Sequence, residues 1–241
     1  MGYQLHAGAE DGRSAWDVPT IGLFTLVTSM GLIGAPAFGY VYGYTTLDWA
    51  LAGILYLISG LGITVGYHRM ISHRSFRSPD WVKVAFLVAG SWAMENSALK
   101  WSANHARHHA RVDQEEDPYN ATKGFWHSHC VWFFKKSPHK TERYAPWLRE
   151  DRIVMWQHRW YVPLLLAGLA LPFLGGYVSN GWRGGGGLFF AGRFRTDIFG
   201  VELHVLHQLR LPSVGKSAVQ PVQFQPGQLV GLADHAGRGI P

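Results

Sequence analysis

Cysteine is nearly absent from this chain of 241 residues, and Cys130 is its single example. One cysteine excludes a disulfide framework and any cysteine-rich zinc or iron–sulfur site. Charged residues are also few, and they are missing altogether from residues 18–47, 49–67 and 160–182. Each of these stretches is long enough to cross about 30 Å of hydrocarbon as a helix. Core helices of a soluble protein are the alternative, but stretches ended by charges and aromatic residues favour membrane spans.

The order of charges along the chain predicts how the spans are arranged. Asp48 alone separates the first two, so we expect a tight hairpin whose outer ends lie on one side of the membrane. Lysine and arginine are dense between Arg69 and Arg159 and absent from the hairpin tip, which places the N-terminus and this segment in the cytoplasm. The net charge of +6 fits a basic face toward anionic lipid and needs no nucleic acid. The sequence therefore predicts an all-α, multi-pass membrane protein with three transmembrane helices and a cytoplasmic helical cap.

A histidine cluster, NHARHHA, lies within the predicted cap. His105, His108 and His109 are spaced i, i+3 and i+4, so on a helix all three imidazoles leave the same face. Neutral imidazoles directed at one point form a transition-metal site.

A second cluster, YHRMISHR, follows the second span and carries His68 and His73. Histidines five residues apart are separated on an ideal helix, so they converge only if the helix ends or distorts between them. Gly66 and Ser72 favour such a distortion. We therefore expect both clusters to contribute to one metal centre.

More than one kind of function fits an all-nitrogen metal site at this stage. Such a site suits iron, copper, nickel or zinc, and about eight imidazoles would be needed to hold two ions. A zinc-dependent membrane hydrolase needs histidines and an acid, which Glu95, Asp113, Glu115 or Glu116 could supply. A metal-binding membrane protein without catalytic chemistry is a further possibility.

The two clusters and their surroundings carry a resemblance to a known family. GYHRMISHRSF, followed by WSANHARHHARVDQEEDPYNATKGFWHSH, resembles the membrane fatty-acid desaturases and, within them, the acyl-CoA branch of Δ9 type. The resemblance extends from about Asp17 to Ala191 and includes the order of the spans. It implies that a cis double bond is introduced into a saturated acyl chain by two non-haem irons, with O2 as co-substrate. Since no electron-carrying domain is fused, the donor is expected to be a separate protein of ferredoxin or cytochrome b5 type.

The resemblance also assigns residues. It implies iron ligation by the five clustered histidines, His68, His73, His105, His108 and His109, and substrate contacts by Trp101 and Trp126. A narrow apolar slot would fix which carbon of the acyl thioester is presented to the metal centre. A related di-iron membrane hydroxylase stays open, because both outcomes start from the same hydrogen abstraction.

The resemblance ends before the chain does. Members of the family continue with a fourth span, an N-S-x-x-H element and a third histidine box of the form HNxHH, none of which occurs here, and no Trp or Tyr follows Trp182. We therefore divide the chain into a mobile N-terminus, 1–17, a desaturase-like membrane domain, 18–191, and an irregular tail, 192–241.

The genetic code offers an explanation for the tail. If each codon after about residue 195 is read one base later, residues 202–215 allow NFTFFINSxCHxWG, which resembles the Asn/His element of the family. Residues 227–240 allow DNWLALLITLGEGY, which resembles the segment before the third box. We hypothesise that the chain from near Gly192 is an out-of-frame, disordered product. The chain as written would then be an inactive fragment with incompletely ligated irons; a divergent tail is the alternative.

The frame hypothesis predicts a single-base insertion or deletion in the codons for Gly192 to Thr196. Sequencing the genomic DNA and its transcript across these codons is the measurement. A clean, in-frame gene with an intact transcript would refute the hypothesis.

Overall fold

The structure is a computed structural model that describes the backbone of residues 16–136 and 141–209 and the side chains of residues 16–136 and 143–192. Chain contacts divide it into two units, 1–207 and 208–241, and the account below concerns the first. Two predicted segments lie mostly outside the described residues. Of the predicted mobile N-terminus, 1–17, the structure describes only residues 16 and 17, and of the predicted irregular tail, 192–241, it describes only residues up to 209.

The helices are α1 (Val18–Ser29), α2 (Ala35–Tyr42), α3 (Thr46–Leu61), α4 (Asp80–Ser91), α5 (Ala98–Ala110), α6 (Phe125–His129), α7 (Arg152–Arg159) and α8 (Tyr161–Leu209). Shorter segments are η1 (Met30–Gly34), η2 (Gly62–Ser72), η3 (Ala121–Lys123), η4 (Val131–Phe134), η5 (Thr141–Tyr144) and η6 (Pro146–Arg149).

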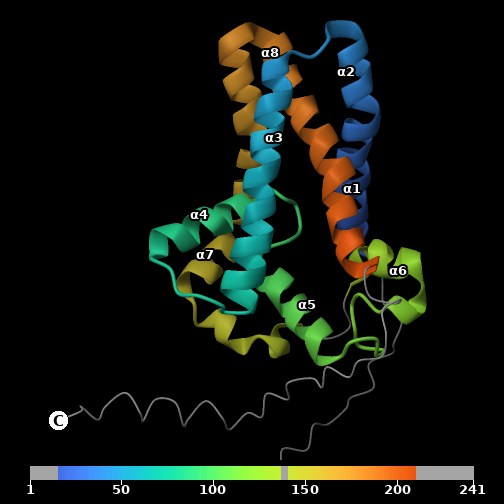
Figure 1. Ribbon diagram of the computed structural model, residues 1–241, viewed down its shortest axis with the longest axis vertical. Helices are drawn as coiled ribbons and strands as arrows, with labels where there is room; N and C mark the ends of the chain where they lie inside the picture. The colour runs from blue at the N-terminus through green and yellow to red at the C-terminus, as the bar shows by residue number, and fades with distance from the viewer. Residues whose placement is uncertain (1–15, 137–140, 210–241) are drawn as a thin grey trace, which may run out of the picture. The chain divides into compact units, whose positions relative to one another are not determined.

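Three helical stretches have the length and hydropathy of membrane spans, as predicted, although the third reverses direction at Asn180 and Gly181. They cover Val18–Tyr42, Thr46–Ser72 and Tyr161–Gly192. Figure 1 shows that the first two run antiparallel and that α4 to α7 gather at the end where η2 lies. The all-α class with three spans is confirmed.

Asp48, the single charge between the first two spans, has a structural role. The chain turns at Gly43, which has φ +71°, and α3 starts after Thr45. The Asp48 carboxylate accepts hydrogen bonds at 2.8 Å from the backbone N–H and the hydroxyl of Thr45, while the Asp48 N–H donates to the Thr45 hydroxyl oxygen at 3.2 Å. This reciprocal cap satisfies donors that a helix start leaves unpaired.

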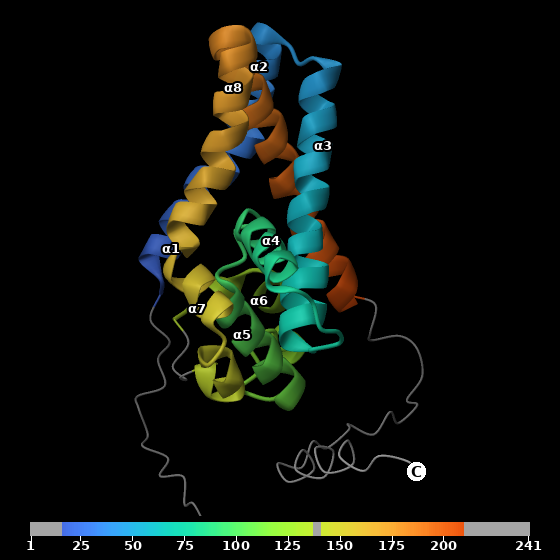
Figure 2. The same cartoon turned by 90° about the vertical axis from the view of Figure 1, so that its left-hand side faces the viewer.

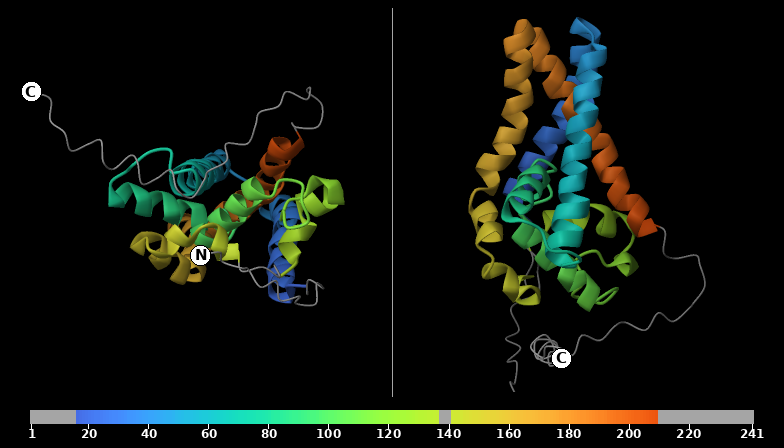
Figure 3. Two further views of the ribbon diagram at one scale, coloured as in Figure 1. Left: turned by 90° about the horizontal axis from the view of Figure 1, so that it is seen from below. Right: turned by 60° about the vertical axis from the view of Figure 1, so that its left-hand side comes forward.

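Helix α8 differs from the predicted end of the membrane domain. It consists of two arms that reverse direction at Asn180 and Gly181, where Gly181 has φ +56°. Figure 1 and the right-hand view of Figure 3 show the two arms, which meet at the top and diverge below. They approach closely because Gly176 and Gly184 meet backbone to backbone.

The second arm continues as helix through residue 209, whereas we predicted an irregular tail from residue 192. A run of glycines explains how the arm packs: Gly186 lies against Phe38, Gly187 lies against Asp48, and the Arg183 guanidinium donates to the Tyr42 carbonyl at 2.7 Å. Once a helix is started, each further residue is added at low cost. Residues 192–209 are therefore helical in backbone, despite the charges among them.

The best-packed part of the described chain lies at the end that carries η2. Figure 2 and the left-hand view of Figure 3 show α4 and α5 lying across the ends of the long helices. Its core joins η2, α4, α5, η6 and α7 through apolar side chains that are at most 7% exposed: Ile63, Tyr67, Met70, Ile71, Leu87, Ala98, Leu99, Ala103, Ala145, Leu148 and Val154. Glycine permits the closest contact, because a Cβ on Gly62 would lie 2.6 Å from the Ala89 carbonyl carbon.

We predict that Gly62→Ala destabilises the chain by about 1–3 kcal/mol, since the new methyl group meets the backbone of α4. Gly60→Ala is the matched control, because a Cβ there has no heavy atom within 4 Å and alanine is favoured in helices by about 1 kcal/mol. Denaturant unfolding in detergent measures both. Equal stability of the two variants would contradict the close contact between η2 and α4.

Candidate metal centre

The segment that carries the first histidine pair is distorted, as the spacing requires. Residues Gly62–Ser72 form a π-helix, in which hydrogen bonds run from i to i+5. The His73 N–H donates to the His68 carbonyl at 3.0 Å, and the Ser72 hydroxyl donates to the Tyr67 carbonyl at 2.7 Å. The wider turn brings residues five apart onto one face, and the Nε2 atoms of His68 and His73 are 3.0 Å apart. The expected distortion between these histidines is present.

Helix α5 presents the second cluster to the first. The Ser97 hydroxyl caps its start by accepting from the Lys100 N–H at 3.5 Å. His105 and His109 follow about two and three turns further along the helix. The Nε2 atom of His105 lies 3.0 Å from that of His73 and 3.0 Å from that of His109. A hydrogen bond of 2.8 Å between the hydroxyls of Ser72 and Ser102 joins η2 to α5 beside these rings.

Three of the predicted ligands form a group that could hold one ion. Among the described residues, ring nitrogens of His68, His73 and His105 all lie within 4.8 Å of one another. An ion bound at about 2.1 Å by two adjacent imidazoles separates their nitrogens by roughly 3 Å, which matches the spacing of this group. His109 borders the group through His105.

His108 is directed differently. Its Nδ1 lies 2.8 and 3.0 Å from the two carboxylate oxygens of Asp117, and its ring centroid is 5.7 Å from that of His109. The bond to Asp117 occupies Nδ1 and leaves Nε2 as the nitrogen for a ligand. Carboxylates that hold a histidine in this way orient the ring and raise its basicity toward a metal.

The surroundings of the cluster favour neutral rings. Burial, together with the nearby His109, His68 and His73, lowers the pKa of His105 to about 2. The pKa of His109 is also lowered, by burial and by His73. Neutral imidazole is the form that binds metal, so the lowered pKa values favour the ligating form of His105 and His109.

Asp117 is a buried anion that the sequence analysis did not assign to the metal centre. Burial raises its pKa, but hydrogen bonds from His108 and from the N–H groups of Asp113 and Tyr119 outweigh this and lower the pKa below 3.8. The sequence signal for this role was a carboxylate directly before a proline, a few residues after the histidine cluster.

Three of the acidic residues that we considered as zinc ligands make side-chain contacts with other residues instead. Glu95 accepts from the Trp101 indole N–H at 2.9 Å, and Glu115 pairs with Lys123 at 2.7 Å. Glu116 accepts from the Tyr144 hydroxyl at 2.7 Å. None of them belongs to the group of His68, His73 and His105 within the described part of the chain.

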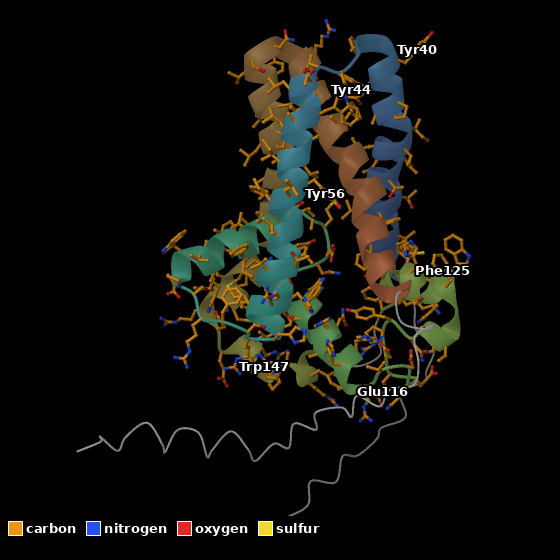
Figure 4. The ribbon with its side chains drawn as sticks, viewed as in Figure 1. Tyr40, Tyr44, Tyr56, Glu116, Phe125 and Trp147 are labelled. Carbon is orange, nitrogen blue, oxygen red and sulfur yellow. The ribbon has the colours of Figure 1, made fainter. Side chains whose placement is uncertain are left out.

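The two candidate substrate contacts lie in different places. Trp101 stacks on His105, with ring centroids 4.9 Å apart and an interplanar angle of 24°, so it lies beside the metal centre. Trp126 is on α6, is 69% exposed and contacts Phe125 and His129. Figure 4 shows Phe125 at the outer side of α6, pointing away from the other helices.

A small pocket lies between α3, the segment after α4 and both arms of α8. The residues around it are Leu55, Ser59, Trp92, Gly168, Leu169, Pro172, Leu188, Phe189 and Gly192. Since α3 continues into η2, one rod carries both the pocket wall and His68.

Curated proteins are similar to this chain over more than half of its length. An sn-1 stearoyl-lipid 9-desaturase of Anabaena variabilis is 33% identical over 153 residues, which cover 61% of this chain and 55% of that protein. An acyl-CoA desaturase of Ovis aries is 35% identical over 174 residues, with 66% and 48% covered. The chain belongs to the fatty-acid desaturase family.

This desaturase-family chain spans about half the length of the first curated relatives it matches. A third relative, Delta-9 acyl-lipid desaturase 1 of Arabidopsis thaliana, is 39% identical over 93 residues, which cover 39% of this chain and 30% of that protein. No family model matches the chain. The relatives' names include both acyl-lipid and acyl-CoA desaturases.

We predict that Asp117→Asn lowers the free energy of unfolding by about 2 kcal/mol at pH 7, because three hydrogen bonds lose their charged acceptor. The folded-state pKa of Asp117 lies below its ordinary 3.8, so the carboxylate stabilises the fold above that pH and ceases to do so as the pH falls through the lower value. Denaturant unfolding at pH 7 and at pH 3 measures the difference between wild type and variant, which should shrink at pH 3. Glu115→Gln, at a side chain that is 88% exposed, is the control and should leave stability unchanged. An equal loss at both pH values would contradict the role of the Asp117 charge.

Proposed function

We propose that this chain is a fatty acyl desaturase by chemistry, built to introduce a cis double bond into a saturated acyl chain. The observation that carries the proposal is the approach of the His68, His73 and His105 ring nitrogens, from two separate helices, at the end of an apolar helical bundle. Membership of the desaturase family supports the same reaction.

The metal ligands in this proposal are His68, His73, His105, His108 and His109. The donor set fits iron, since all five side chains are imidazoles and the nitrogens of the first three are spaced as ligands of one ion. Five imidazoles cannot fill the coordination spheres of the two irons that the family implies. With O2, bound irons would supply the oxidising power needed to remove hydrogen from an unactivated CH2 group.

The chain's own residues then position the reactants. Asp117 fixes the tautomer and orientation of His108, and Trp101 covers one face of His105. The pocket lined by Leu55 and Leu169 marks the place between the spans where the hydrocarbon tail would enter. Regioselectivity follows from where a tail in this pocket places its carbons relative to the histidines.

The substrate that we propose is an acyl-CoA thioester, and an acyl group on a membrane lipid is the alternative that the experiment below separates. Electrons would come from a separate ferredoxin or cytochrome b5 type protein. The excess of Lys and Arg between Arg69 and Arg159 favours a cytoplasmic location for the metal centre and the N-terminus. Trp126, exposed on α6, is a candidate contact for the acyl headgroup.

The proposal also concerns the condition of this particular chain. The frame change that we hypothesise near Gly192 would remove the third histidine box, which leaves the metal centre incompletely ligated. A shell with missing ligands binds metal more weakly and admits water. We propose that the chain as written has little or no desaturase activity.

We predict that the purified chain, loaded anaerobically with Fe2+ and desalted, retains fewer than two irons per chain and that His105→Ala lowers the retained iron by about tenfold or more. His127→Ala is the control, because His127 lies outside the ligand group among the described residues. Elemental analysis by mass spectrometry measures both. Retention of two irons by wild type, or equal loss in the two variants, would contradict the ligand assignment.

We further predict that correcting the reading frame by one base restores turnover. The assay supplies stearoyl-CoA or a stearoyl lipid, O2 and reduced ferredoxin, and gas chromatography identifies the product. An alkene supports a desaturase and an alcohol a hydroxylase, whereas zinc-dependent hydrolysis would refute both. Robust turnover by the uncorrected chain would contradict its proposed inactivity.

A further inference from the structure

Gln157 is the most deeply buried polar side chain of α7. It is 0% exposed, although it lies far along the sequence from both histidine clusters. Tyr67 and Ser91, which it contacts, are also 0% exposed, so water does not share this network. A buried amide at such a place has to find all its partners within the protein.

The side-chain amide of Gln157 joins three helical segments at once. Its nitrogen donates to the Tyr67 hydroxyl at 2.8 Å and to the Ser91 hydroxyl at 2.8 Å, while its oxygen accepts from the Ala98 N–H at 3.0 Å. The Ala98 N–H can only donate, so the amide orientation is fixed with its oxygen toward α5 and its nitrogen toward the two hydroxyls.

Two of these partners adjoin the ligand segments directly. Tyr67 precedes His68 in η2, and Ala98 is the first residue of α5, whose later turns carry His105, His108 and His109. The amide therefore sets the spacing between the two segments that have to bring their ring nitrogens to 3.0 Å.

Neighbours of Gln157 strengthen the same attachment. The His158 Nδ1 lies 2.7 Å from the hydroxyl of Ser97, the N-cap of α5, and the Tyr161 hydroxyl accepts from the Asn96 N–H at 3.2 Å. Asn96 has φ +74°, a conformation that few residues adopt unless their surroundings hold them there. The start of α5 is thus fixed by the α7–α8 junction.

We infer that Gln157 is a positioning residue of the metal centre, which acts through Tyr67 and Ala98 to hold η2 and α5 in the register that brings His68, His73 and His105 together. The inference rests on the proposed function, since it assigns to Gln157 a role in that metal site. Removing the amide would leave the Ala98 N–H buried without its acceptor, and the segments would shift to satisfy it. A shift of a fraction of an ångström is enough to alter a coordination sphere.

The test uses Co2+ bound to the full-length chain in detergent, because its visible absorption reports the number and geometry of its ligands. We expect Gln157→Leu to weaken Co2+ binding by about tenfold or more and to change the absorption bands, as is found for residues that orient ligands. Tyr67→Phe removes only the hydroxyl that accepts from Gln157. This variant should change the Co2+ absorption bands in the same direction, to a smaller extent.

Lys83→Met is the matched control. Lys83 pairs with Asp151 at 2.8 Å and also joins α4 to α7, but it touches neither η2 nor α5 through that pair. Its loss should lower thermal stability while leaving the Co2+ bands of the wild type unchanged.

The outcomes separate the inference from the function on which it rests. If wild type binds Co2+ and Gln157→Leu and Tyr67→Phe keep its bands, Gln157 does not position the centre. If wild type binds no Co2+, the proposed metal site fails. Amide hydrogen exchange then tests whether Gln157 holds η2 and α5 together. Exchange over residues 62–73 and 98–110 should rise in Gln157→Leu and Tyr67→Phe but not in Lys83→Met; equal exchange in all three would overturn the inference. Tyr67→Phe also decides the matter if Gln157→Leu does not fold.

Discussion

The separation of 3.0 Å between the Nε2 atoms of His73 and His105 is the constraint on which the rest of this structure depends. The two rings belong to different helical segments, and neither segment can set this separation alone. Ring nitrogens at such distances attract one another only when a proton or a metal lies between them, because otherwise their lone pairs face each other. The arrangement therefore has to be maintained by contacts outside the cluster.

Those contacts come from small residues and buried hydrogen bonds. Gly62 and Gly90 allow η2 and α4 to touch through their backbones, and the Tyr67 ring lies against Gly90. The hydroxyls of Ser72 and Ser102 then join η2 to α5, and the Gln157 amide connects both to α7. Because each of these groups is buried or close-packed, a change at any of them is transmitted to the rings with little relaxation.

The sequence allowed the spans and part of the centre to be predicted, for reasons visible in single residues. Long stretches without charge define the membrane rods, and the i, i+3, i+4 spacing of His105, His108 and His109 places them on one face of α5. The convergence of His68 with His73 could only be predicted conditionally, since spacing alone does not reveal a π-helix.

Other features were not accessible from local patterns. Gln157 pairs with a residue that lies ninety positions away in the chain, and no periodicity marks such a contact. The reversal of α8 at Asn180 and Gly181 depends on glycine contacts with α2 and α3, and the charges that follow concealed it. Asp117 lies nine residues after His108, and no spacing rule for helices or strands brings these two side chains together.

The distribution of these contacts separates the scaffold of the centre from its completion. The hydrogen bonds that hold η2, α4, α5 and α7 together all join residues between Tyr67 and Tyr161, before the position at which we place the change of reading frame. The described histidines can therefore be held in place by in-frame sequence alone, whereas further ligands would have to come from beyond Gly192. If the hypothesised frame change is present, the chain keeps the geometry of the described histidines and lacks the ligands that would complete the centre. Metal affinity and turnover then report on different parts of the sequence, so the loss of one does not imply the loss of the other.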